Sequence, residues 1–251
     1  MKKIRVAHII TRMCKGGAQE NTFHTVRLHN RERFDVDLVC GSNSGDEGTL
    51  EPEIEDAGIE IIREPNLQRD LDLKKDFRAL RRLRKILKHG RYDIVHTHTS
   101  KAGFLGRMAA RHAKVPIIIH TPHGNIFDGY FSPLSTSVFT ALERRAVRWT
   151  DRIIELTEGG IESHLTQGIG TRDQYTTIFS GIDFAPFENR MSDRSRIREE
   201  FGVSDDTILI GGVGRLEPIK GFAYLIEAAE MVLKKRRNVR FIHAGTGALE
   251  E

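Results

Sequence analysis

Four histidines close two short apolar segments within residues 93–125. His96 and His98 end the first segment, and His120 and His123 end the second. The pattern of this stretch predicts strand, loop, helix, strand and loop, in that order. Because the carboxyl ends of parallel strands line the binding crevice of an open α/β sheet, we expect the imidazoles at that edge. Side-chain alternation also places His96 and His98 on one side of their strand.

Imidazole side chains at this edge could bind a metal ion, support the loops or contact a substrate. No carboxylate or cysteine stands at a familiar metal-ligand spacing from them, so we expect no metal ion. We expect at least two of the four to be structural. His123 is the best candidate for substrate contact, because Gly124 and a loop with Phe127, Tyr130 and Phe131 follow it and could line a site for an organic ligand.

Two loops ahead of predicted helices could offer backbone N–H groups to an anion. Gly16 and Gly17 would let a ligand approach the backbone closely, unless they only make a tight turn. Ser100 and Lys101 open the helix that follows the first histidine strand, and Lys101 adds positive charge there. The alternative is a serine N-cap beside a solvated lysine. The dinucleotide fingerprint G-x-G-x-x-G is absent, which argues against NAD.

The most specific motif is the sequence GGVGRLEPIKG at residues 211–221. Small residues including Gly214 end a predicted strand there, and Arg215 and Lys220 lead into a helix. Arginine offers phosphate oxygens a planar fork, and lysine offers a mobile point charge. The motif therefore suits a diphosphate, with an ordinary basic loop as the alternative.

Strands alternate with helices along the whole sequence, which predicts an α/β fold with a parallel sheet and right-handed crossovers. The regular alternation of strands and helices ends after residue 184. We therefore predict a Rossmann-like domain over residues 1–185, a linker with a short helix over 186–206, and the start of a second Rossmann-like domain over 207–251. One strand-helix-strand unit cannot cover both faces of its own sheet, so we expect the second domain to be incomplete.

The composition limits where the protein works. Two cysteines, Cys14 and Cys40, cannot form a disulfide framework and favour a reduced, cytoplasmic protein. No apolar run approaches the roughly 18 residues of a membrane-spanning helix.

A basic segment at residues 74–91 stands out from the modest net charge of +4. It contains nine Lys or Arg residues and one acid, Asp76, around an apolar stripe. Such a segment is either a solvated helix face or a surface that binds an anionic membrane, which would make the protein peripheral on the inner face of the membrane. No nucleic-acid motif accompanies it, so we expect no nucleic-acid partner.

Together these motifs resemble the family 4 glycosyltransferases, which are retaining enzymes of GT-B fold. The matching pieces are Gly16-Gly17-Ala18, DIVHTHTSKAG, IIHTPHG, the SGID turn at 180–183, GVGRLEPIKGFAYLIEAA and the terminal AGTG. The resemblance implies two Rossmann-like domains facing across a cleft. A nucleoside-diphosphate sugar would bind mainly to the second domain, and a glycan or lipid-linked acceptor mainly to the first. The implied activity is that of a hexosyltransferase in cell-surface polysaccharide biosynthesis.

The resemblance also implies roles for single residues. Arg215 and Lys220 match the pair that grips the donor diphosphate and stabilises the charge of the leaving group. His123 matches a histidine that contacts the transferred sugar, and Gly17 matches the loop glycine that lets diphosphate and acceptor approach. Enzymes of this family generally need no metal ion or other cofactor.

One family feature is missing. Two glutamates with seven residues between them, E-x7-E, help hold the donor in the family, and the 251-residue sequence ends before the region that would carry them. We therefore expect this chain alone to be inactive. Two further hypotheses stay open: a non-catalytic binding or scaffold half of a split transferase, and a GT-B-like sugar-nucleotide epimerase.

Overall fold

The computed structural model describes residues 2–43, 48–124, 133–188 and 191–250. The chain divides into two compact units, Met1–Gly181 and Ile182–Glu251. Each unit has its own parallel sheet. The assignment of the first part to the acceptor and the second to the donor remains a prediction.

The first unit is built on a seven-stranded parallel sheet, which confirms the predicted α/β class. In spatial order the strands are β3 (Ile61–Arg63), β2 (Phe34–Cys40), β1 (Ile4–Ile10), β4 (Ile94–His98), β5 (Ile117–Thr121), β6 (Arg152–Glu155) and β7 (Tyr175–Thr177). The order reverses between β1 and β4. In a doubly wound sheet this switch point is where a ligand crevice forms.

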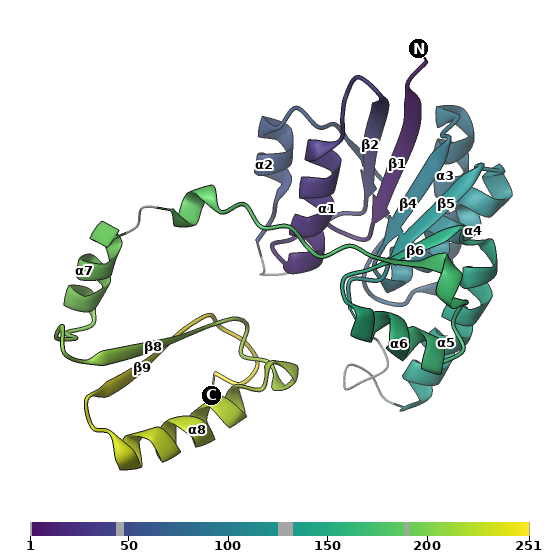
Figure 1. The fold of residues 1–251 in the computed structure, drawn as a ribbon. Helices are drawn as coiled ribbons and strands as arrows, with labels where there is room; N and C mark the ends of the chain where they lie inside the picture. Colours follow the sequence, from purple (N-terminus) through teal and green to yellow (C-terminus); the bar gives the residue numbers. More distant parts are fainter. Residues whose placement is uncertain (1, 44–47, 125–132, 189–190, 251) are drawn as a thin grey trace. The chain divides into compact units, whose positions relative to one another are not determined.

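Helices cover both faces of this sheet. They are α1 (Gly17–Leu28), α2 (Glu51–Asp56), α3 (Leu73–Gly90), α4 (Ser100–Ala113), α5 (Pro133–Ala146) and α6 (Glu158–Thr166). Figure 1 shows α1 and α2 on one side of the sheet and α3 and α4 on the other. Short 3₁₀ turns at Val147–Trp149 and Arg172–Gln174 complete the unit.

Side-chain alternation along β1 divides the core into two layers. Ala7 and Ile9 pack with the residues of α3 and α4, whereas Val6 and Ile10 pack with the residues of α1 and α2. Successive strand residues point to opposite faces, so His8 lies on the α1 side together with Val6 and Ile10. This side is where the candidate site is found.

The basic segment folds as the amphipathic helix α3. Asp72 caps its first turn by accepting hydrogen bonds from the backbone N–H groups of Lys74 and Lys75, each at 3.0 Å. Leu83 and Leu87 are fully buried against the sheet, while Phe77 near the N-terminal end is largely exposed. No helix among the described residues is long and apolar enough to cross a membrane.

The second unit contains the two-stranded parallel sheet of β8 (Ile208–Val213) and β9 (Val239–Ala244). Its helices are α7 (Met191–Glu200) and α8 (Phe222–Lys235), with 3₁₀ turns at Ala185–Phe187 and Pro218–Lys220. The turn predicted at residues 180–183 is wrong, because this segment forms no regular turn. The carboxylate of Asp183 instead accepts a hydrogen bond from the backbone of Ala185, at the start of the next 3₁₀ turn.

Candidate functional site

Histidines from neighbouring strands gather on the α1 side of the sheet, at the switch point. His8 of β1 stands opposite His96 of β4 in the strand register. The rings of His96 and His98 lie 4.2 Å apart between centroids, so these two side chains share one face of β4, as predicted. His8 was not among the predicted site residues. It came into the site only through the register of β1 against β4.

Four imidazoles form a continuous hydrogen-bonded row, which we call the histidine chain: His29, His8, His98 and His123. His29 Nε2 lies 3.1 Å from His8 Nε2, and His8 Nδ1 lies 2.9 Å from His98 Nε2. His98 Nδ1 then lies 2.8 Å from Nε2 of His123. The row runs from the half-buried His29, just after α1, to the loop that follows β5. In each link one nitrogen carries the hydrogen and the other accepts it.

Burial keeps these imidazoles neutral. Desolvation lowers the pKa of His8 and His98 well below the usual value, and neighbouring imidazoles lower both further. The same cause lowers the pKa of His96 to about 3 and that of His123 to about 4. A neutral imidazole has one donor and one acceptor nitrogen, so the site offers directional hydrogen bonds rather than positive charge.

His123 ends the chain with one nitrogen unused. Its Nδ1 is buried and has no hydrogen-bond partner among the residues that the structure describes. Its backbone φ is 64°, a left-handed conformation that costs a non-glycine residue on the order of 1–3 kcal/mol. The adjacent Gly124 is exposed, and a Cβ added there would meet no atom within 4 Å. A buried donor or acceptor without a partner, next to open space, is what a ligand-binding atom requires.

His120 lies on the opposite face of the sheet and is separate from the chain. Its Nδ1 is 2.9 Å from the hydroxyl of Thr97. A Cβ at Gly103 of α4 would approach the His120 ring to 2.5 Å. Gly103 therefore lets α4 lie directly on this imidazole, which makes His120 a packing residue. His96 has a partner as well, since its Nε2 is 2.8 Å from the Thr121 hydroxyl.

His8, His96 and His98 present ring nitrogens within 4.8 Å of one another, close enough to share a metal ion. No carboxylate or cysteine among the described residues joins this group. Both ring nitrogens of His8 and of His98 already take part in the histidine chain, so an ion would have to replace those hydrogen bonds. The absence of a metal remains a prediction.

The two predicted anion-binding loops differ in the structure. Gly16 is the N-cap of α1, where a Cβ would come to 2.9 Å from the Gln19 side chain, whereas a Cβ on Gly17 would meet nothing within 4 Å. At α4 the N-cap is Thr99, and Lys101 Nζ lies 2.6 Å from the carboxylate of Asp76 with only 12% of its side chain exposed. The alternative of a Ser100 N-cap with a solvated lysine is therefore wrong. Substrate contact by these residues remains a prediction.

The predicted diphosphate loop connects β8 with α8 in the second unit. Gly214 follows β8 with a φ of 152°, and Gly221 caps α8 with a φ of 69°, so both glycines adopt conformations that other residues rarely take. Arg215 and Lys220 between them are exposed. Neither forms an ion pair with any other described residue. The loop thus holds two available cations at the carboxyl end of a strand.

A family model described as a glycosyl transferase 4-like domain matches residues 16–179. This chain belongs to the family 4 glycosyltransferases. The match runs from the glycine loop before α1 to the end of β7 and so includes His98, His123 and Gly124. Tyr130, the remaining predicted substrate-binding residue of this family 4 chain, lies outside the described residues.

Similar proteins cover the whole chain. The "UDP-Gal:alpha-D-GlcNAc-diphosphoundecaprenol alpha-1,3-galactosyltransferase" of Escherichia coli is 32% identical over 98% of this chain and 63% of its own length. The capsular polysaccharide biosynthesis glycosyltransferase CapM of Staphylococcus aureus is 24% identical over 98% of this chain and 62% of its own. The structure of Anabaena HepE in complex with UDP-glucose is similar with a TM-score of 0.75, at 20% identity over 99% of this chain and 62% of that one. The chain therefore has the GT-B-type fold and spans less than two thirds of these relatives.

Proposed function

We propose that this family 4 chain takes part in the transfer of a hexose from a nucleoside-diphosphate sugar to an acceptor, with retention of configuration. The observation that carries the proposal is Nδ1 of His123, a residue of the loop after β5 bonded to His98, which has no hydrogen-bond partner among the described residues. A neutral imidazole held by a second histidine can make one well-aimed hydrogen bond to a sugar hydroxyl. Because the hydrogen bond to His98 already orients the His123 ring, the ring would need little reorganisation during the reaction.

Arg215 and Lys220 would hold the diphosphate of the donor. In the reaction the bond between the anomeric carbon and a diphosphate oxygen breaks, the acceptor hydroxyl oxygen forms the new bond to the anomeric carbon, and the hydroxyl proton passes to the released diphosphate. Negative charge then develops on the diphosphate. Two exposed cations without ion-pair partners can stabilise that charge, with Gly214 allowing a close approach to the backbone. No metal ion is needed for this role.

For the donor and acceptor we propose the classes named for the Escherichia coli relative, a UDP-hexose and a lipid-linked diphosphate sugar. Such an acceptor fits a cytoplasmic protein that contacts the inner face of a membrane through the exposed cations of α3. Charge reversal at Arg81, Arg84 and Lys85 should then weaken binding to anionic liposomes, and unchanged binding would remove the membrane from the proposal.

We also propose that the 251-residue chain alone does not catalyse transfer, because it spans only 63% of the length of its Escherichia coli relative. A binding or scaffold half of a split protein would share this inactivity but would not need a donor site. An epimerase would need the same diphosphate loop. The family match to transferases favours transfer.

Titration of the chain with UDP, followed by phosphorus NMR, tests the proposal. We expect saturable broadening of the β-phosphate signal. Replacing both Arg215 and Lys220 by alanine should weaken binding at least about tenfold, the equivalent of roughly 1.4 kcal/mol. Arg237→Ala, at another exposed cation of the same unit, is the matched control. UDP binding that is absent, or that the double variant leaves unchanged, contradicts the proposal.

A further inference from the structure

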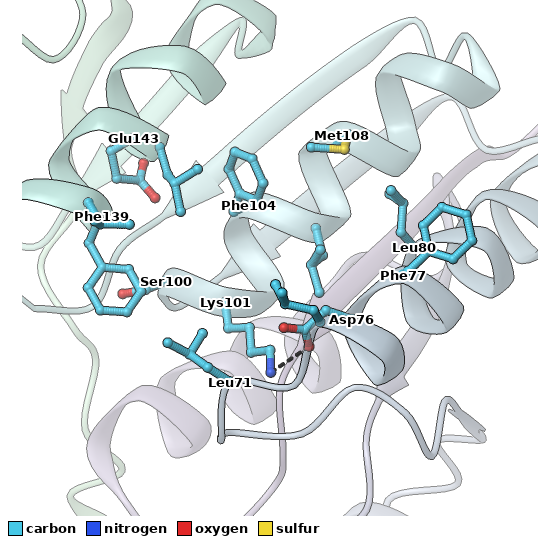
Figure 2. Close-up of a pocket in the computed structure, with 14 residues that line it drawn as sticks. Leu71, Asp76, Phe77, Leu80, Ser100, Lys101, Phe104, Met108, Phe139 and Glu143 are labelled. Carbon is cyan, nitrogen blue, oxygen red and sulfur yellow. Dashed lines mark ion pairs between the residues drawn. The ribbon is translucent and has the colours of Figure 1, made fainter. Parts of the chain in front are cut away.

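An apolar cavity of about 370 Å³ lies between α3, α4 and α5 in the first unit, away from the histidine chain. Figure 2 shows Phe77, Phe104 and Phe139 around this space, with Leu71 and Met108 on its wall. The volume is in the range of cavities that bind small organic molecules.

The charged groups in the wall already have partners. Asp76 is paired with Lys101 at 2.6 Å (Figure 2). Glu143 receives the fully buried Arg107, whose Nη2 is 2.7 Å from both carboxylate oxygens. The wall therefore presents compensated ion pairs and hydrocarbon surface, which fits an apolar occupant rather than a charged one.

The mouth of the cavity is also apolar. Leu73, Phe77 and Val138 line it and are 89%, 59% and 52% exposed. Large exposed side chains that continue into a cavity mark an interaction site. The guanidinium of Arg81 lies over the Phe77 ring, 5.9 Å from its centre, so positive charge stands at the edge of the apolar surface. Hydrocarbon inside and cations at the rim match a molecule with a long apolar chain and an anionic head.

We propose that this cavity binds the isoprenoid chain of a lipid-linked diphosphate acceptor, with the diphosphate beside the cations of α3. The inference rests on the proposed function, because it names the binding site for the acceptor's lipid. Because the ion pairs of the wall are already compensated, the cavity would bind the isoprenoid chain through burial of its apolar surface. The cations of α3 would attract the diphosphate head group.

The single tryptophan offers a direct readout. Trp149 lies beside Phe104, with 6.4 Å between ring centroids, and Phe104 lines the cavity. Geranylgeranyl diphosphate should change the Trp149 fluorescence saturably, whereas inorganic diphosphate should not. Val138→Asp puts a charge in the mouth and should raise the half-saturating concentration at least about tenfold. Leu134→Asp makes the same change on an exposed residue of α5 outside the cavity lining and should change it less than about twofold.

Phe77→Asp provides a second blocking variant on α3, and thermal unfolding verifies that each variant is folded. Equal binding by the wild type and both blocking variants would overturn the proposal. Self-association that Val138→Asp abolishes in the absence of lipid would also overturn it, since a second copy of the chain would then be the occupant. The assay contains no donor, so its failure leaves the UDP-binding test of the transferase untouched.

The histidine chain carries an independent inference. Four neutral imidazoles in a row can carry their hydrogens in only two concerted arrangements. In one, every ring donates toward His123 and His123 Nδ1 is a donor. In the other, every ring donates toward His29 and His123 Nδ1 is an acceptor. Converting the first arrangement into the second moves one proton across each of the three hydrogen bonds. One proton then leaves His123 Nδ1, and one is taken up at His29.

We infer that His29, His8 and His98 are positioning residues that set whether His123 Nδ1 donates or accepts. Heteronuclear NMR of the histidine rings reports the tautomer of each residue. His29→Ala, at the half-buried end of the chain, should change the tautomer populations of His8, His98 and His123, although His29 has no hydrogen bond to the last two. His24→Ala, on α1 outside the chain, should change none. A change confined to His8 would overturn the inference.

Discussion

The two candidate functional regions, one in each unit, are built in opposite ways. In the first unit, the histidine chain is largely buried, neutral and held by hydrogen bonds at every ring, and Nδ1 of His123 has no partner among the described residues. In the second unit, Arg215 and Lys220 are exposed and charged and form no ion pair with another residue that the structure describes. The first region can give direction to a hydrogen bond before a ligand arrives. The second supplies charge and gains its geometry from the anion it binds.

If the first unit is a rigid frame, breaking the buried ion pair between Arg107 and Glu143 should have the largest effect on stability. Glu143→Ala leaves the fully buried Arg107 without its carboxylate partner. We expect the free energy of unfolding to fall by about 3–5 kcal/mol. Denaturant unfolding measures this change. The exposed pair of Arg172 with Glu158 is the control, and Glu158→Ala there should cost no more than about 1 kcal/mol.

Mild acid should destabilise the first unit through its buried histidines. The folded-state pKa values of His8, His96 and His98 lie below the unfolded value, so the unfolded chain binds more protons as the pH falls. The stability that these rings contribute is present above about pH 6.5 and is lost below it, at up to about 1.4 kcal/mol per pH unit for each ring. Denaturant midpoints measured between about pH 7 and pH 5 test this, and a flat profile contradicts the buried neutral chain.

Alanine substitution at two glycines of the first unit, Gly103 and Gly17, should have smaller and unequal effects on the free energy of unfolding. Gly103→Ala would press a methyl group against the His120 ring and should cost about 1–3 kcal/mol in thermal or denaturant unfolding. Gly17→Ala is the matched substitution at a helix position with no atom within 4 Å and should stay within about 0.5 kcal/mol of the wild type. Equal effects at both positions would mean that α4 does not rest on His120.

The smallest effect on stability is expected in the second region. Arg215→Ala and Lys220→Ala remove exposed side chains without ion-pair partners, so unfolding should change by less than about 0.5 kcal/mol. A larger loss would show that these cations hold the loop together and are not free for an anion.

The local sequence pattern was enough to predict α3 and to place Arg215 and Lys220 directly before a helix, α8, because periodicity and glycine positions are local properties. The local pattern did not predict that His8 and His29 belong to the candidate site. Their role depends on the pairing of β1 with β4, which joins residues about 90 positions apart. Lys101 is a similar case, since its partner Asp76 sits on another helix and looked like a lone acid in a basic segment.

The proposed transfer depends most on a hydrogen bond from His123 to the donor sugar. The most direct measurement is the ring NMR signal of His123 during titration with a UDP-hexose and, separately, with UDP. The predicted result is that the Nδ1 signal of His123 shifts with the UDP-hexose and stays in place with UDP, since only the sugar supplies a partner for that nitrogen. A His123 signal that does not move when the UDP-hexose is bound would contradict the proposed contact of His123 with the donor sugar.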